Sequence, residues 1–280
     1  MCNAVENEYL GYKIIHDGEN IAKMYESDMT DNCVGCLTNE YAITTDADGN
    51  AKDRFRWNGN KFVRVSDKPI VTKFGGKVSA KNLQQELALD LIQNESITIK
   101  MIAGRFGSGK TFLLSAAAIQ MVERGVFDQI VFIRNNVEVR GSKPIGFLPG
   151  EYNDKLAPFA ACFADHIGGE SGLEMMIRDR KVVIQHLGFL RGRDIKNSVI
   201  FVSEAENLTK EHIQLIVSRA GEGSQVWFDG DLKQRDAELF EKNSGMALAI
   251  DRLKGHPRFG YVKLLKSERS ETAAMADLLD

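Results

Sequence analysis

The stretch that decides the fold is Gly104-Arg105-Phe106-Gly107-Ser108-Gly109-Lys110-Thr111, which fits the pattern G-x-x-x-x-G-K-[ST]. It follows an apolar run, 97–103, that predicts a β-strand, and it precedes an amphipathic run, 110–124, that predicts an α-helix. A glycine-rich turn in this context lets the backbone surround phosphate oxygens at the positive end of the helix. The stretch therefore predicts a phosphate-binding loop, or P-loop.

The two residues that end this loop carry its chemistry. The Lys110 ammonium neutralises charge on the β and γ phosphates, and the Thr111 hydroxyl can ligate Mg²⁺. An ordinary turn ending in a solvated lysine is disfavoured, because motif and context agree. The expected cofactors are ATP and Mg²⁺, and the candidate nucleotide-binding residues are Gly104, Arg105, Phe106, Gly107, Ser108, Gly109, Lys110, Thr111 and Phe112.

Apolar strands alternate with helices on both sides of the loop, from residue 81 onward. Further strands are expected at 129–133, 182–185, 198–202, 225–228 and 261–265, and helices at 82–93, 151–166, 210–220, 246–254 and 271–279. Short apolar strands between helices predict an α/β fold with a parallel sheet covered on both faces.

Residues 1–66 have a different pattern, in which strand-like runs at 40–45, 54–57 and 61–65 are separated by Asp48-Gly49 and Asn58-Gly59. Asp-Gly and Asn-Gly suit two-residue hairpin turns, so a small all-β meander is expected. Residues 67–80 are interpreted as a linker and 81–280 as the α/β domain.

Composition and charge limit the class of protein. The chain has 280 residues, of which 43% are hydrophobic and only 5 are proline, so a packed fold of one or two domains is expected. No run is long enough to span a membrane and the first residues do not resemble a signal peptide, so the cytoplasm is the expected compartment. Residues 1–50 carry 10 acidic and 2 basic residues, which leaves 34 Lys and Arg against 29 Asp and Glu in a mildly basic remainder.

Cys33 and Cys36 have the spacing of a zinc knuckle, but no second ligand pair follows them. Two reduced thiols are therefore the favoured interpretation.

The strand expected at 198–202 ends in Ser203-Glu204-Ala205-Glu206-Asn207. P-loop enzymes place acidic residues at such a strand end to position Mg²⁺ and the attacking water. Glu204 is the candidate that orients or deprotonates water, with a solvated glutamate as the alternative. Ser203 stands where an aspartate is expected and can hold a Mg²⁺-bound water by a hydrogen bond. The candidate metal-site residues are Thr111, Ser203 and Glu204.

The strand expected at 225–228 continues into Asp229-Gly230-Asp231, with Gln234 three residues further on. Asp231 and Gln234 can place a carboxylate and an amide near the γ-phosphate, where they would sense hydrolysis. Without a preceding P-loop, Asp229 and Asp231 would be interpreted as turn residues.

Five ordered blocks resemble the PhoH family of phosphate-starvation-inducible ATPases, which are similar to the first RecA-like domain of superfamily-one helicases. Besides the P-loop, they are Val137-Glu138, 146–150 with Lys155 and Pro158, 189–193, 204–207 and 230–234. The resemblance covers about 82–279 and implies a RecA-like P-loop core. Residues 48–57 resemble the segment that joins a PIN nuclease to a PhoH ATPase, although no PIN domain is expected within this sequence.

The resemblance also implies roles for residues outside the P-loop. Gln85 is expected to read the adenine edge, with a surface helix glutamine as the equal alternative. Arg191 and Arg193 are expected near a subunit interface or a phosphate-bearing ligand, and a solvated loop is the alternative. Arg269 is a candidate arginine finger or, equally, part of a charge cluster at a helix start.

Two departures from the family pattern lie at one strand end. Ser203 replaces the usual aspartate, and Glu206 replaces the usual glutamine. Loss of a carboxylate that orients a metal-bound water typically costs roughly 10–100-fold in metal affinity or activity, so slow hydrolysis is expected.

These inferences together predict an ATP hydrolase with Lys110, Glu204, Asp231, Gln234, Arg191, Arg193 and Arg269 as its catalytic set. We expect it to couple ATP to helicase-like work on RNA or single-stranded nucleic acid, as a homo-oligomeric ring such as a hexamer and without a membrane. The alternative is a nucleotide-responsive scaffold that docks a partner such as a separate nuclease.

Overall fold

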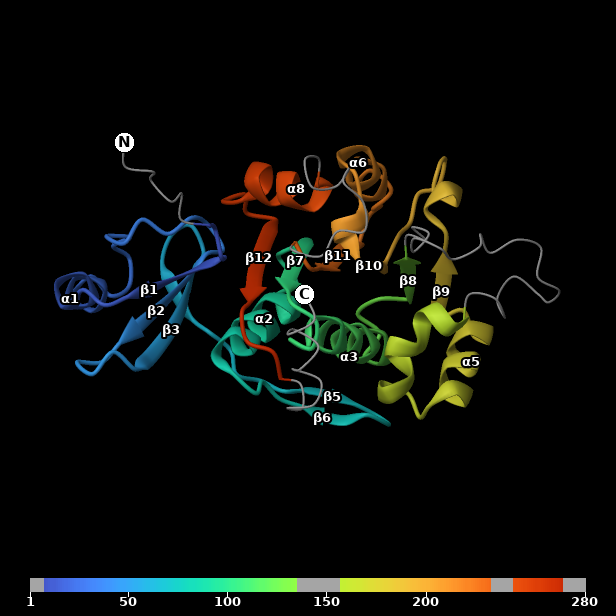
Figure 1. Cartoon of the computed structure of the whole chain (residues 1–280), viewed down its shortest axis with the longest axis horizontal. Coiled ribbons are helices and arrows are strands. Elements are labelled where there is room, and N and C mark those ends of the chain that lie inside the picture. The colour runs from blue at the N-terminus through green and yellow to red at the C-terminus, as the bar shows by residue number, and fades with distance from the viewer. Residues whose placement is uncertain (1–7, 135–156, 233–243, 269–280) are drawn as a thin grey trace, which may run out of the picture.

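The computed structural model describes residues 8–134, 157–232 and 244–268. Its centre is a six-stranded, all-parallel sheet in the order β12-β7-β11-β10-β8-β9 (Figure 1). The strands are β7 (Ile99–Gly104), β8 (Gln129–Arg134), β9 (Val182–Gln185), β10 (Ser198–Ser203), β11 (Gln225–Gly230) and β12 (Phe259–Leu264). The predicted α/β core with a RecA-like parallel sheet is confirmed.

Helices cover both faces of this sheet (Figure 1). The helices on one face are α2 (Leu83–Gln93), α3 (Lys110–Glu123), the 3₁₀ segment η1 (Ala157–His166) and α5 (Glu170–Arg178), and those on the other face are α6 (Lys210–Val217) and α8 (Gly245–Leu253). Consecutive strand residues alternate between the two cores: Trp227 packs with the α3 side and Phe228 with the α6 side. Two short 3₁₀ segments, η2 (Leu187–Phe189) and η3 (Ala205–Asn207), follow β9 and β10.

The N-terminal region contains β1 (Tyr12–Ile15), α1 (Gly18–Glu26), β2 (Tyr41–Thr45), β3 (Ala51–Trp57) and β4 (Phe62–Arg64). The expected antiparallel meander is present as β2-β3-β4. The description of the region as all-β needs correction, because helix α1 joins β1 to its parallel neighbour β2. Asp17 caps α1 and Met24 is fully buried beneath it, so this helix belongs to the small core of the region.

Residues 67–80, expected as a linker, contain a β-hairpin formed by β5 (Ile70–Thr72) and β6 (Gly76–Val78). Ile70 is buried in the main core, and Gln120 of α3 donates a hydrogen bond to the Val71 carbonyl at 3.2 Å. The helix expected at 271–279 and the first part of that expected at 151–166 lie outside the described residues. Among the described helices, none combines the length and apolar character needed to cross a bilayer.

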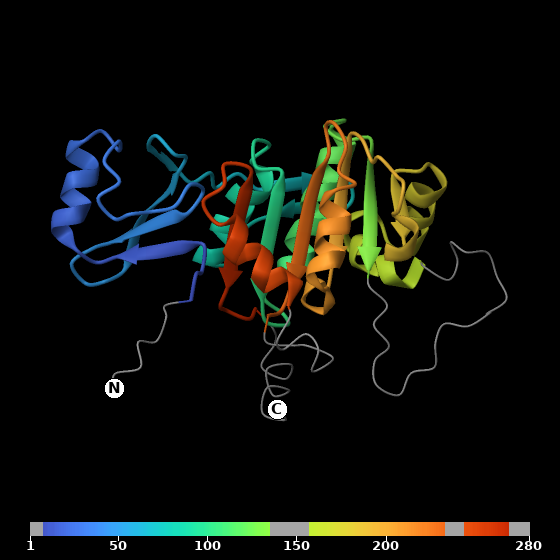
Figure 2. The same ribbon diagram turned by 90° about the horizontal axis from the view of Figure 1, so that it is seen from above.

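The N-terminal region lies beside β12 and α2 (Figure 2). Asn39 Nδ2 donates to the Phe259 carbonyl at 2.9 Å, which ties the region to β12. On α2, the Asp90 carboxylate accepts hydrogen bonds from Tyr41 Oη at 2.9 Å, from Arg56 Nε at 3.3 Å and from the Ser66 backbone at 2.9 Å. One carboxylate on the helix therefore holds three parts of the N-terminal region.

Cys36 is buried, and desolvation raises the pKa of its thiol to about 12. The Cys33 thiol donates a hydrogen bond to the Asn20 carbonyl at 3.3 Å. Thiolate is the form that binds zinc, and the environment of Cys36 opposes it.

Lys100, the second residue of β7, leads to a prediction about stability. Its side chain is fully buried, donates to the Ile92 carbonyl at 2.6 Å and lies 4.9 Å from the centre of the Trp227 ring. Desolvation lowers the pKa of Lys100 from the ordinary value of 10.5 to about 7, so the unfolded chain binds the proton more readily than the folded chain between these values. Stability should therefore fall as the pH is lowered towards 7.

We expect Lys100→Met to remove this pH dependence. The difference in free energy of unfolding between parent and variant should change by up to about 5 kcal/mol across that pH range. Urea denaturation at a series of pH values measures it. Parallel pH profiles for parent and variant would contradict the prediction.

Candidate nucleotide site

The predicted P-loop connects β7 to α3 with two glycines in left-handed conformations, Gly107 at φ 73° and Gly109 at φ 87°. Side chains rarely adopt such angles, which explains glycine at these two positions. Lys110 Nζ lies 5.4 Å from the centre of the exposed Phe106 ring and 3.4 Å from the Arg105 carbonyl oxygen, to which it donates. The lysine head thus rests on its own loop and is available to a phosphate.

A cavity of about 190 Å³ opens beside the loop. It brings together the predicted residues Phe106, Lys110, Thr111, Ser203, Glu204 and Asp231, and adds Phe132, Ala161, Cys162, Glu206 and Asp229. The residues converge because the carboxyl ends of parallel strands lie on one edge of a sheet. The volume is below that of typical whole-ligand pockets, so this part of the site suits the phosphate end of a nucleotide.

Asp229 is a residue of the candidate site to which sequence reasoning did not assign a role. It is the penultimate residue of β11, is 1% exposed, and accepts a hydrogen bond from Thr111 Oγ1 at 2.5 Å. Its second oxygen accepts from the Glu204 backbone N–H at 2.9 Å. The signal in the sequence was an acidic residue at a strand end, but its importance depends on the strand order, in which β11 lies between β7 and β10.

Glu204 has a left-handed backbone, with φ 58° and ψ 45°, directly after β10. This conformation is unfavourable for a glutamate, and such strain persists only where surrounding contacts impose it. The hydrogen bond from its N–H to Asp229 is such a contact. The structure therefore fixes the direction in which the Glu204 side chain leaves the sheet.

Glu206 is buried at the wall of the cavity, and its Oε2 has no hydrogen-bond partner among the described residues. Desolvation, with a smaller contribution from the Asp229 charge, raises the pKa of Glu206 to about 8. At neutral pH this side chain is therefore protonated for the most part and resembles the amide of a glutamine in charge.

Gln85 is buried, which excludes the surface-helix alternative. Its Nε2 donates to the Ser108 carbonyl at 2.9 Å, and its Oε1 accepts from the Lys81 backbone at 2.8 Å. The residue therefore supports the P-loop from α2. The segment after β12 closes the same side of the loop, since the Glu268 backbone N–H donates to the Gly107 carbonyl at 2.9 Å.

The remaining predicted residues have different surroundings. Phe112 is half exposed on α3, does not line the cavity, and its ring lies 4.5 Å from the His166 ring. Arg191 and Arg193 are exposed after β9, which is four strand positions, or roughly 19 Å, from β7. Neither of these arginines lines the cavity. Gln234 and Arg269 lie outside the described residues, so their roles stay predictions.

The donor set fits Mg²⁺. Within the described part of the chain, no three His, Cys, Asp or Glu side chains form a cluster that holds a metal by itself. Mg²⁺ at nucleotide sites needs only one or two protein oxygens, because phosphate oxygens and water complete its octahedral shell. The Thr111 hydroxyl and the carboxylate that accepts its proton are oxygen donors of this kind.

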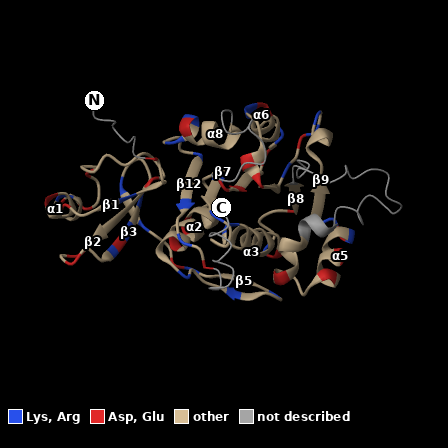
Figure 3. Cartoon of the chain, viewed as in Figure 1, with Lys and Arg blue, Asp and Glu red and all other residues tan. Residues whose placement is uncertain are grey.

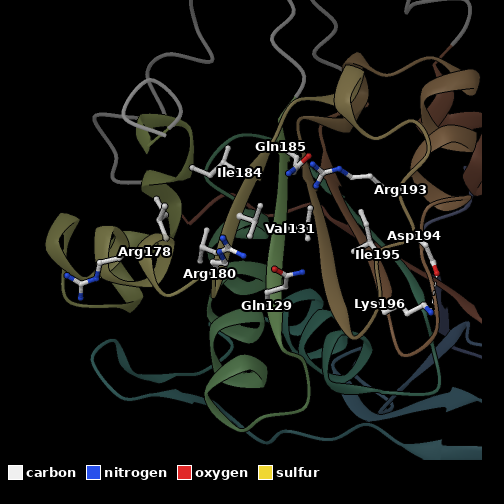
Figure 4. A pocket seen from close by; sticks show the side chains of 13 residues that line it. Gln129, Val131, Arg178, Arg180, Ile184, Gln185, Arg193, Asp194, Ile195 and Lys196 are labelled. Atoms are coloured by element: carbon white, nitrogen blue, oxygen red, sulfur yellow. Dashed lines mark ion pairs between the residues drawn. The ribbon is translucent and has the colours of Figure 1, made fainter. Parts of the chain in front are cut away.

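A second, larger hollow of about 680 Å³ lies at the β9 edge of the sheet, with lining side chains from β8, β9 and the segment before β10 (Figure 4). We call it the basic groove because its lining includes Arg178, Arg180, Arg193 and Lys196. Arg178 and Lys196 pair with Asp179 and Asp194, respectively. Within the described residues, no ion pair involves Arg180 or Arg193. Elsewhere, basic and acidic residues are interspersed over the described parts of the molecule (Figure 3).

Comparisons with known proteins agree with this geometry. A family model described as PhoH-like protein matches residues 77–277. The Bacillus subtilis protein PhoH2 is 36% identical over 218 residues, covering 72% of this chain and 48% of that protein. PhoH2 of Mycolicibacterium smegmatis is 34% identical over 199 residues, covering 70% of this chain and 45% of that protein. A Synechocystis PhoH-like protein is 33% identical over 187 residues, covering 65% of this chain and 55% of that protein. The chain thus spans about half the length of these relatives.

The buried position of Gln85 leads to a prediction about the P-loop. Gln85→Ala leaves the Ser108 carbonyl and the Lys81 amide without their partner, which should destabilise the fold by about 1–3 kcal/mol. Because the side chain contacts loop backbone, the affinities for ATP and GTP should fall together. Thermal melting and nucleotide titration measure both effects, with the exposed helical Gln214→Ala as the matched control. A loss confined to ATP would instead identify Gln85 as an adenine reader.

Proposed function

This chain belongs to the PhoH-like protein family, and on that premise we propose that it binds ATP with Mg²⁺ at its P-loop and hydrolyses the γ-phosphate bond. The family is one of P-loop NTPases, and the parallel sheet has the corresponding architecture. The observation that carries the proposal is the single cavity in which Lys110 and Thr111 face Glu204, Asp229 and Asp231. A phosphate-binding cation on one side and carboxylates on the other match the needs of phosphoryl transfer.

Each side chain then has a defined task toward the nucleotide. Lys110 leaves its contacts with Arg105 and Phe106 to bind the β and γ phosphates, and Thr111 presents its hydroxyl oxygen to the metal. A bound Mg²⁺ supplies neutralisation of the charge that develops on the phosphate oxygens. Glu204, fixed by its backbone contact to Asp229, orients the attacking water and accepts its proton. Asp231 lines the same cavity, where it would respond to loss of the γ-phosphate.

We propose that a neighbouring subunit supplies an arginine that takes part in the reaction. The described residues that line the cavity include no arginine, while Arg191 is exposed at the distant β9 end of the sheet and does not line the basic groove. P-loop enzymes commonly receive such an arginine in trans. A homo-oligomeric ring is the assembly that would bring Arg191 of one copy to the P-loop of the next.

For the work coupled to ATP, we propose binding of RNA or single-stranded nucleic acid in the basic groove. Arg180 and Arg193 are exposed there without an ionic partner among the described residues, and a guanidinium binds phosphate oxygens in a bidentate manner. The Gln129 and Gln185 side chains add neutral hydrogen-bonding groups to the same surface.

The first prediction tests nucleotide binding. Lys110→Ala removes the main counter-charge of the phosphates and should weaken ATP binding by about 10–100-fold, the value of a charge-assisted hydrogen bond. Calorimetry with ATP and Mg²⁺ measures it, and the exposed Lys77→Ala serves as the control with the same loss of charge. An unchanged affinity in Lys110→Ala would contradict the P-loop assignment.

The second prediction tests nucleic-acid binding. The double variant Arg180→Ala and Arg193→Ala should bind a single-stranded oligonucleotide more weakly, because two phosphates of the strand are no longer neutralised. The slope of log affinity against log salt should fall by about 1.4, or 0.7 for each of these phosphates. Fluorescence anisotropy at several salt concentrations measures this slope. Lys52→Ala with Lys61→Ala removes two exposed charges from the N-terminal region as the control. ATP binding without any binding of nucleic acid by the parent would favour the scaffold function.

A further inference from the structure

The carboxylate expected at the end of β10 is absent, because that position is Ser203. The sheet register shows what stands beside it. Val202 of β10 pairs with Phe228 of β11, so the next position along β11, Asp229, is opposite Ser203. An acidic side chain is therefore present at the same level of the sheet, one strand away.

This neighbouring strand is the one closer to the P-loop. β11 lies between β10 and β7, and Asp229 itself pairs with Ile102 of β7. A carboxylate on β11 rather than on β10 is one strand spacing, about 4.8 Å, closer to β7, the strand that leads into the P-loop. This position explains the direct contact of Asp229 with Thr111, for which no bridging group is needed.

The hydrogen bond between Thr111 and Asp229 determines how the threonine hydroxyl faces a metal. A hydroxyl has one proton and two lone pairs, and here the proton is donated to Asp229 Oδ2 at 2.5 Å. The lone pairs of Thr111 Oγ1 are then free to face the cavity. Acceptors that orient a metal ligand in this way also make it more basic and typically raise metal affinity by roughly 10–100-fold.

We propose that Asp229 has taken over, from the neighbouring strand, the Mg²⁺-directed role of the carboxylate that Ser203 lacks. This inference rests on the proposed function, since it concerns the metal bound with ATP. Asp229 is a positioning residue: it orients the Thr111 hydroxyl on one side and the Glu204 backbone on the other. The residue is only 1% exposed, so its charge acts with little screening by bulk water.

The proposed role of Asp229 also changes the effect that we expect from a substitution of Ser203. Ser203→Asp alone would place a second carboxylate beside Asp229, in a cavity that already includes Glu204 and Asp231. Like charges at this separation oppose one another. The single substitution should therefore not improve Mg²⁺ binding, and the slow hydrolysis expected from Ser203 alone does not follow when Asp229 supplies the charge.

A cycle of three variants tests the proposal: Asp229→Asn, Ser203→Asp, and the two combined. Asparagine keeps the size of the side chain and an acceptor for the Glu204 N–H while removing the charge. The measured quantity is the gain in affinity for a non-hydrolysable ATP analogue between EDTA and Mg²⁺, determined by calorimetry, with the electron paramagnetic resonance of bound Mn²⁺ as a second signal. Thermal melting checks that each variant folds, and the exposed Asp251→Asn controls for the loss of one charge.

We expect Asp229→Asn to keep its affinity in EDTA and to lose the Mg²⁺-dependent gain by roughly 10–100-fold, and the combined variant to recover most of it. An unchanged gain in Asp229→Asn would overturn the proposal. A loss without recovery in the combined variant would also overturn it, because a purely structural role predicts that result. Failure of the parent to bind the analogue at all would instead refute the proposed function.

Discussion

The candidate site depends on the two hydrogen bonds that the buried carboxylate of Asp229 accepts. It joins the start of α3, through the Thr111 hydroxyl, to the end of β10, through the Glu204 backbone. Because both oxygens accept hydrogen bonds, one rigid group constrains the distance between the start of α3 and the Glu204 backbone. The left-handed backbone of Glu204 and the direction of Thr111 Oγ1 both follow from this geometry.

The parts of this arrangement that could be predicted from the sequence are those with local causes. Glycine at 107 and 109 is required by positive φ angles, and the strand and helix beside the loop follow from apolar periodicity. The strand ending at Ser203 and the position of Glu204 were predicted for the same reason. The side chains of Lys110, Thr111, Glu204 and Asp231 meet in one cavity, as their positions at strand ends and at a helix start indicated.

The parts that could not be predicted depend on contacts between segments distant in sequence. Asp229 resembles a turn residue until the order of the strands is known, because only then does its proximity to Thr111 emerge. Gln85 carries no sign in its own helix that its amide reaches the Ser108 carbonyl. Helix α1 was missed because the strand-like runs and turn dipeptides around it favoured a meander, although Ile21, Met24 and Tyr25 recur at helical spacing within its nine residues.

Helix α2 connects the N-terminal region to the P-loop, although the two are not in direct contact through the hydrogen bonds described above. Near its start, Gln85 holds the loop, and near its end, Asp90 holds Tyr41, Arg56 and the Ser66 backbone. A helix of eleven residues is short and stiff, so its two ends move as one body. The N-terminal region therefore supports the candidate site from outside, because α2 links the contacts of Asp90 to the hydrogen bond between Gln85 and the Ser108 carbonyl. A partner that bound to that region and displaced it would therefore also displace the P-loop.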